Sequence, residues 1–217
     1  MKYPCLVLDH DDTVVQSEST VNYPFFCYIL NEFRPGTTIT LEEYVHGCSE
    51  LGFVKMCQQW YAFTPEELEL ECRGWRAYIM NHIPAPFPGI RELIQKQKAD
   101  GGLVCVVSHS TKENIIRDYE AHFGVQPDSV FGWDYPEHQR KPHPYPLLEI
   151  MKKYDLQPKD LLVVDDMKPA YDMAKAAGVE IAFAGWGRKD YPQVYAQMKA
   201  LCDYTFDTPE ELSAFLF

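Results

Sequence analysis

The sequence predicts an α/β protein in three layers, with helices covering both faces of a parallel sheet. Three observations support this prediction. Short runs rich in Val and Leu recur along the chain, helical patterns lie between them, and three of the runs end in polar residues. Continuous apolar runs of this length are typical of strands buried on both faces, and strands that alternate with helices favour a parallel sheet with right-handed crossovers.

The apolar runs define the expected strands, which in chain order are residues 2–8, 102–107, 161–164 and 180–184. Asp9 follows the first strand and Ser108 follows the second. Asp165 and Asp166 follow the third. In parallel sheets, functional groups gather at the carboxyl ends of the strands. We therefore expect these side chains to converge on one crevice.

Helical periodicity fills the segments between the strands, with apolar side chains on one face of each segment. These helices are expected at residues 89–99, 112–122, 146–154 and 170–177. The last is rich in alanine and stops at Gly178, which suits the residue just past a helix end.

The stretch from residue 15 to residue 84 has a different character, because it contains no run that resembles a buried strand. Helices are expected at residues 21–33, 41–48, 53–61 and 65–81. Thr64 precedes a proline and two glutamates, a typical helix start. A proline-rich connection, residues 84–89, closes the stretch. We predict a core domain of residues 1–14 and 85–217, and a small helical cap domain of residues 15–84 inserted after the first strand.

The charge and the cysteine content of the sequence limit the kinds of molecule that the protein is expected to bind. A formal net charge of −12 disfavours nucleic acid and acidic membrane surfaces, and a phosphorylated substrate would need a local positive source such as a bound divalent cation. None of the seven cysteines forms a Cys-x-x-Cys pair, so neither a zinc knuckle nor a redox pair is indicated. The first apolar run is too short for a signal segment or a membrane span. We expect a cytoplasmic protein, and the sequence does not indicate its oligomeric state.

Residues 9–13, Asp-His-Asp-Asp-Thr, carry the central chemical signal. Asp9, at a buried strand end, could attack phosphorus and form an aspartyl-phosphate. Asp11, two residues on, could protonate the leaving group and later activate water. A bound Mg²⁺ would relieve the repulsion between the two carboxylates. Taken alone, the segment is equally consistent with an acidic turn that caps a helix.

Each of the other candidate site residues, taken alone, also has both a functional and a purely structural interpretation. Ser108 and the backbone of His109 could hold phosphate oxygens, although serine is an ordinary helix cap. Lys141 could neutralise Asp9 and a phosphoryl group, or could be a solvated loop lysine. Asp165 and Asp166 could bind magnesium, or could cap the alanine-rich helix.

Together and in this order, the four segments resemble the motifs of the haloacid dehalogenase superfamily. That family has an Asp-x-Asp-x-Thr after strand one, a Ser or Thr after strand two, a Lys before a helix, and a late acidic pair. The resemblance covers nearly the whole chain, and the inserted helices resemble the cap of the phosphoglycolate phosphatase and β-phosphoglucomutase branch.

The resemblance implies a Rossmann-like core and a role for each matched residue. Asp9 would be the nucleophile and a magnesium ligand, and Asp11 the acid/base, with its backbone carbonyl on the metal. Ser108, the His109 backbone and Lys141 would hold the phosphoryl group, and Asp166, with Asp165, would bind magnesium. Asp12 departs from the family pattern because it stands where this branch usually has glycine, so we expect a left-handed turn there.

The same resemblance implies a substrate-sampling loop in the cap, with His46 and Glu50 as its candidates; a helix-ending turn is the alternative. We expect a Mg²⁺-dependent phosphatase that hydrolyses a small phosphomonoester metabolite. The alternatives are a phosphomutase, which the acidic Glu50 disfavours, and a non-catalytic domain that binds phosphometabolites, which the presence of Asp9 and Asp11 disfavours.

Overall fold

The computed structural model describes all residues from 1 to 217, and the chain divides into two compact units. The first unit comprises Met1–Gln16 and Ala85–Phe217, and the second comprises Ser17–Pro84. Two stretches that are far apart in the sequence therefore build the first unit, and the second unit is one continuous stretch between them.

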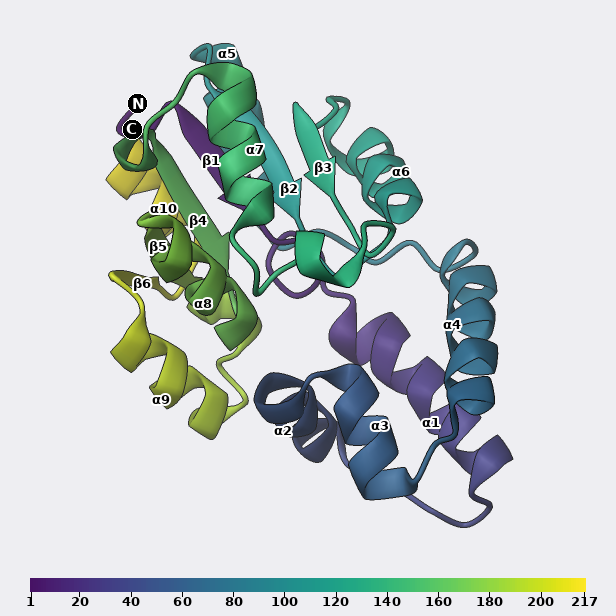
Figure 1. Ribbon diagram of the computed structural model, residues 1–217. Helices are drawn as coiled ribbons and strands as arrows, with labels where there is room; N and C mark the ends of the chain where they lie inside the picture. The colour runs from purple at the N-terminus through teal and green to yellow at the C-terminus, as the bar shows by residue number, and fades with distance from the viewer. The chain divides into compact units, whose positions relative to one another are not determined.

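A six-stranded parallel sheet with the order β3-β2-β1-β4-β5-β6 forms the centre of the first unit (Figure 1). The chain builds outward from β1 in one direction, then returns to its other side and builds outward again. This is the Rossmann-like order, which leaves a crevice at the carboxyl end of β1. The predicted α/β core is confirmed. The strands are β1 (Cys5–Leu8), β2 (Leu103–Val107), β3 (Ser129–Phe131), β4 (Leu161–Asp165), β5 (Glu180–Ala184) and β6 (Tyr204–Phe206).

Helices pack on both faces of this sheet, because alternate strand residues point to opposite faces. Leu6 and Leu8 of β1 belong to the apolar cluster that includes α5 (Ile90–Ala99), α6 (Lys112–Phe123) and α10 (Pro209–Leu216). Cys5 and Val7 belong to the cluster on the other face, which includes α7 and α8. The helices of this unit are α5 (Ile90–Ala99), α6 (Lys112–Phe123), α7 (Tyr145–Tyr154), α8 (Lys168–Ala177), α9 (Pro192–Leu201) and α10 (Pro209–Leu216), with short 3-10 turns η2 (Glu137–Gln139), η3 (Pro158–Asp160) and η4 (Gly185–Gly187).

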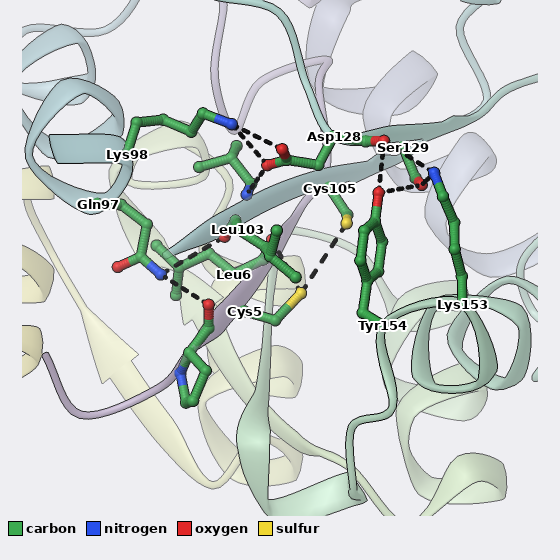
Figure 2. A network of polar contacts seen from close by, with 12 residues as sticks. Cys5, Leu6, Gln97, Lys98, Leu103, Cys105, Asp128, Ser129, Lys153 and Tyr154 are labelled. Carbon is green, nitrogen blue, oxygen red and sulfur yellow. Dashed lines mark hydrogen bonds and ion pairs between the residues drawn. The ribbon is translucent and has the colours of Figure 1, made fainter. Parts of the chain in front are cut away.

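The edge strand β3 is held by a polar network around Asp128, the residue before it (Figure 2). The Asp128 carboxylate accepts two hydrogen bonds from Lys98 Nζ, at 2.7 and 2.8 Å, and one from the Val104 backbone N–H at 2.7 Å. The Tyr154 hydroxyl donates to the Asp128 carbonyl at 2.6 Å. These contacts tie the start of β3 to α5, β2 and α7.

The second unit is all helical, as its sequence predicts. Thr64 caps α4 (Pro65–Ile79) as expected, since its Oγ1 accepts a hydrogen bond from the Glu67 N–H at 3.2 Å. Phe26 lies at the centre of an aromatic cluster, with ring centroids 5.1 Å from Tyr44 and 5.7 Å from Phe53. The elements are a π-helical turn η1 (Glu18–Asn22) followed by α1 (Tyr23–Phe33), α2 (Leu41–Leu51), α3 (Phe53–Tyr61) and α4 (Pro65–Ile79).

Among all the helices of the chain, none combines the length and the apolar character that crossing a membrane requires.

Candidate active site

The loop after β1 carries the predicted nucleophile and the predicted acid/base. Asp9 follows the last residue of β1, and its backbone N–H donates to the carbonyl of Val164 in β4 at 2.9 Å. Asp12 has the left-handed backbone conformation, with a φ of 53°, and its N–H donates to the Val15 carbonyl at 2.8 Å. Aspartate is one of the few residues that tolerate this conformation. The left-handed turn expected from the sequence is therefore confirmed.

Lys141 reaches this loop from the segment before α7. Its Nζ donates to Asp9 Oδ1 at 2.7 Å and to Asp165 Oδ2 at 2.8 Å. Burial alone would lower the pKa of Lys141, but Asp165 and Asp9 together raise it above its usual value, so the ammonium stays charged. Because only 6% of the residue is exposed, the solvated-lysine alternative is excluded. Asp9 Oδ2 accepts no hydrogen bond from the chain, so Lys141 engages one oxygen of Asp9 and leaves the other.

Three buried carboxylates meet at the ends of the two central strands. Candidate ligand oxygens of Asp9, Asp165 and Asp166 all lie within 4.8 Å of one another. The pairing of β1 with β4 explains this convergence, because Leu8 lies opposite Val164 and the next residues of the two strands are Asp9 and Asp165. The structure thus brings together three of the side chains that the sequence predicts to converge, namely Asp9, Asp165 and Asp166. Their roles stay predictions.

The charges at this site do not balance within the chain. Four buried carboxylates face two buried cations; they are Asp9, Asp12, Asp165 and Asp166, with Lys141 and Arg188. Burial raises the pKa of Asp165 to about 7, and the nearby Asp9 adds to the rise. Burial also raises the pKa of Asp166, although Arg188 opposes this. Raised pKa values mean that this cluster resists ionisation while it has no further cation beside it. Closely spaced carboxylate oxygens of this kind suit a hard divalent cation, since Mg²⁺ prefers oxygen ligands and carboxylates.

Asp11 differs from the other aspartates of the site in its exposure. Asp9 and Asp12 are buried, whereas Asp11 is only partly buried. A general acid must reach both the leaving group and, later, a water molecule. The exposure of Asp11 is compatible with that requirement.

The predicted phosphate-binding residues lie at the end of β2. Ser108 is 2% exposed, and its Oγ accepts the backbone N–H of Ser110 at 3.1 Å. The imidazole Nε2–H of His109 donates to the Lys141 carbonyl at 2.9 Å, and burial lowers the pKa of this ring to about 4. This bond ties the loop after β2 to the loop that carries Lys141. Thr111, rather than Ser108, caps α6, so the helix-cap alternative for Ser108 does not hold.

Sequence reasoning missed Arg188 as a component of the site. Its guanidinium is 1% exposed and contacts both Asp12 and Asp166. The only sequence signal was indirect, namely Asp12, which departs from the glycine that the family resemblance leads one to expect and which needs a counter-charge once it is buried. The predicted cap residues His46 and Glu50 lie on α2 of the second unit, and their contact with a substrate stays a prediction.

The Rossmann-like strand order, with a cluster of carboxylates and a lysine at the strand ends, is typical of an α/β enzyme whose active site is built from acidic residues. The chain belongs to the haloacid dehalogenase-like hydrolase family, whose model matches residues 6–184. The family resemblance inferred from the motifs is thus confirmed.

Individual relatives agree with this assignment. The chain is 30% identical to a phosphoglycolate phosphatase of Nitrosospira multiformis over 114 residues, which is 50% of this chain and 48% of that protein. The chain spans about half the length of the curated relatives it matches.

Solved structures match over nearly the full length. A protein of Haemophilus somnus described as a predicted phosphoglycolate phosphatase superposes with a TM-score of 0.78 at 21% identity, covering 99% of this chain and 98% of the other. CbbY of Rhodobacter sphaeroides in complex with phosphate gives 0.73 at 19% identity, covering 97% and 96%. At these identities the likeness concerns the fold.

Proposed function

We propose that the chain is a Mg²⁺-dependent phosphatase that hydrolyses a small phosphomonoester metabolite through an aspartyl-phosphate on Asp9. The observation that carries the proposal is the contact of the buried Lys141 with Asp9 and Asp165, beside a cluster of three carboxylates. Phosphoryl transfer depends mainly on positioning and on the stabilisation of negative charge. This site offers a fixed cation, a carboxylate nucleophile and a place for a metal.

The metal would be held by Asp9, Asp165 and Asp166, with the Asp11 carbonyl as a further ligand implied by the family resemblance. When bound, Mg²⁺ supplies positive charge to the phosphate oxygens and reduces the repulsion between the substrate and the carboxylates. The close approach of three buried carboxylates supports this assignment.

The reaction would proceed in two steps carried by the two aspartates of the first loop. Asp9 Oδ2, which accepts no hydrogen bond from the chain, attacks phosphorus, and the bond from phosphorus to the leaving oxygen breaks. Asp11 gives its proton to that oxygen, so the product leaves as an alcohol.

In the second step Asp11, now ionised, takes a proton from water as the water attacks the aspartyl-phosphate. Inorganic phosphate leaves and the Asp9 carboxylate is restored. Lys141 holds Asp9 Oδ1 throughout, and its charge stabilises the phosphoryl oxygens. Ser108 and the His109 backbone would orient the same oxygens.

The test is turnover of a panel of phosphomonoesters, with and without Mg²⁺. The panel should include 2-phosphoglycolate, because two of the curated relatives are named phosphoglycolate phosphatase. We expect release of inorganic phosphate from at least one small substrate, its loss with a chelator, and its loss in Asp9→Asn.

Asp100→Asn is the matched control, because Asp100 is exposed and pairs only with Lys96; it should keep full activity. Mg²⁺-dependent turnover by Asp9→Asn would refute the mechanism. An isomerised sugar phosphate in place of free phosphate would identify a phosphomutase instead.

A further inference from the structure

The segment after β5 packs closely against the loop that carries Asp9 and Asp11. The Trp186 indole Nε1–H donates to the Thr13 carbonyl at 2.9 Å. Gly187 lies so near Asp12 that a Cβ on it would come within 1.9 Å of the Asp12 carbonyl oxygen. The next residue, Arg188, therefore enters the site from a fixed backbone position.

Arg188 joins two parts of the site that are far apart in the sequence. One arm, Nη1, donates to Asp12 Oδ2 at 2.8 Å, and the other arm, Nη2, lies 2.5 Å from Asp166 Oδ2. The guanidinium is planar and rigid, unlike a lysine ammonium on its flexible stem. With its backbone fixed and both arms engaged, Arg188 sets where the Asp166 carboxylate lies relative to the first loop.

As a result of this contact, the two carboxylate oxygens of Asp166 have different partners. Oδ2 faces Arg188, whereas Oδ1 has only a long contact of 3.3 Å with the Thr13 hydroxyl. Because the ion pair with Arg188 occupies Oδ2, Oδ1 would be the oxygen left for a cation. Mg²⁺ requires near-ideal octahedral geometry, while Ca²⁺ accepts six to eight oxygens and often takes both oxygens of one carboxylate.

We propose that Arg188 is a positioning residue that limits Asp166 to a single ligand oxygen and thereby favours Mg²⁺ over Ca²⁺ at this site. The inference rests on the proposed function, since it assumes that the carboxylate cluster binds a divalent cation. Arg188 would then orient a metal ligand in addition to stabilising the fold. Asp12 would hold the other arm of the Arg188 guanidinium in place.

The measurement is calorimetric titration of the substrate-free protein with Mg²⁺ and, separately, with Ca²⁺. The quantity compared is the ratio of the two dissociation constants, because loss of one positive charge strengthens the binding of both cations alike and cancels in the ratio. Wild type, Arg188→Gln and Arg188→Lys are compared. The Arg188→Lys variant keeps the positive charge but removes the rigid pair of donor groups of the guanidinium. It also provides the comparison with wild type if Arg188→Gln does not fold.

We expect the preference for Mg²⁺ over Ca²⁺ to fall about tenfold or more in both variants, the size of effect typical of residues that orient metal ligands. Lys98→Met is the matched control, because it removes an ion pair of the same unit that lies outside the site (Figure 2). A role in folding alone would lower stability and leave the ratio unchanged.

An unchanged ratio in folded Arg188 variants, with Mg²⁺ still bound by wild type, would overturn this inference and leave the proposed function standing. Absence of any divalent cation binding by wild type would overturn the proposed metal dependence as well.

Discussion

Glu71 gives a prediction whose size can be worked out from the structure. It lies on α4 of the second unit and is 7% exposed. Burial raises its pKa from 4.5 to about 7. Replacement by glutamine keeps the shape of the side chain and removes the ionisation, so Glu71→Gln isolates the effect of charging this group.

The direction in which the free energy of unfolding changes with pH follows from comparing the protonation of Glu71 in the folded and unfolded chains. Below about pH 4.5, Glu71 is protonated in both states and has no effect on the pH dependence of stability. As the pH rises, the unfolded chain releases its proton first, so the folded state becomes relatively less stable until the pH passes the folded pKa. A shift from 4.5 to about 7, at 1.36 kcal/mol for each unit, amounts to roughly 3 kcal/mol.

The assay is urea unfolding at about pH 5 and about pH 8, followed by circular dichroism and by tryptophan fluorescence, to which Trp75, one helical turn from Glu71, contributes. We expect Glu71→Gln to gain stability over wild type between the two pH values, by most of that amount. Glu69→Gln, an exposed neighbour on the same helix, is the control and should show no such gain. An identical pH slope in wild type and Glu71→Gln would refute the reasoning.

Two further predictions concern the site. Lys141→Met removes the cation that contacts Asp9 and Asp165, so we expect kcat at saturating Mg²⁺ to fall by about 10²–10³-fold; unchanged steady-state kinetics would show that Lys141 does not stabilise the transferring group. Gly187→Ala places a Cβ against the Asp12 carbonyl, so we expect a loss of about 1–3 kcal/mol in urea unfolding together with reduced turnover. Gly101→Ala meets no atom but carries the strain of a φ of +83°, so it should lose stability and keep its turnover. Equal turnover in both variants would contradict the close packing described for Gly187.

The central strands were readable from the sequence because each is a continuous run of buried apolar residues. The edge strands β3 and β6 were not, since each has three residues and only partial burial. Such short segments become strands only by pairing with a neighbour, here β2 and β5. Helix α9 was missed as well.

The same contrast applies to the site. Asp9, Lys141 and the acidic pair were identifiable because each follows a recognisable motif, and their convergence follows from parallel strand order. Arg188 was not identifiable, because its place in the site depends on an ion pair with Asp12, which is 176 residues away in the sequence. No local sequence pattern indicates that pairing. The sequence predicted the left-handed turn at Asp12. It did not predict that the Asp12 carboxylate pairs with the guanidinium of Arg188.

The most direct test of the proposed function is to trap the phosphoryl group on the chain. In Asp11→Asn, p-nitrophenyl phosphate should still transfer its phosphoryl group, because its leaving group needs no proton, but hydrolysis should slow by about 10²–10⁴-fold. Acid quenching followed by mass spectrometry of peptides should then find one phosphoryl group on Asp9, and none in the Asp9→Asn variant. A burst of p-nitrophenol without phosphorylated Asp9, or a phosphoryl group on another residue, would contradict Asp9 as the nucleophile.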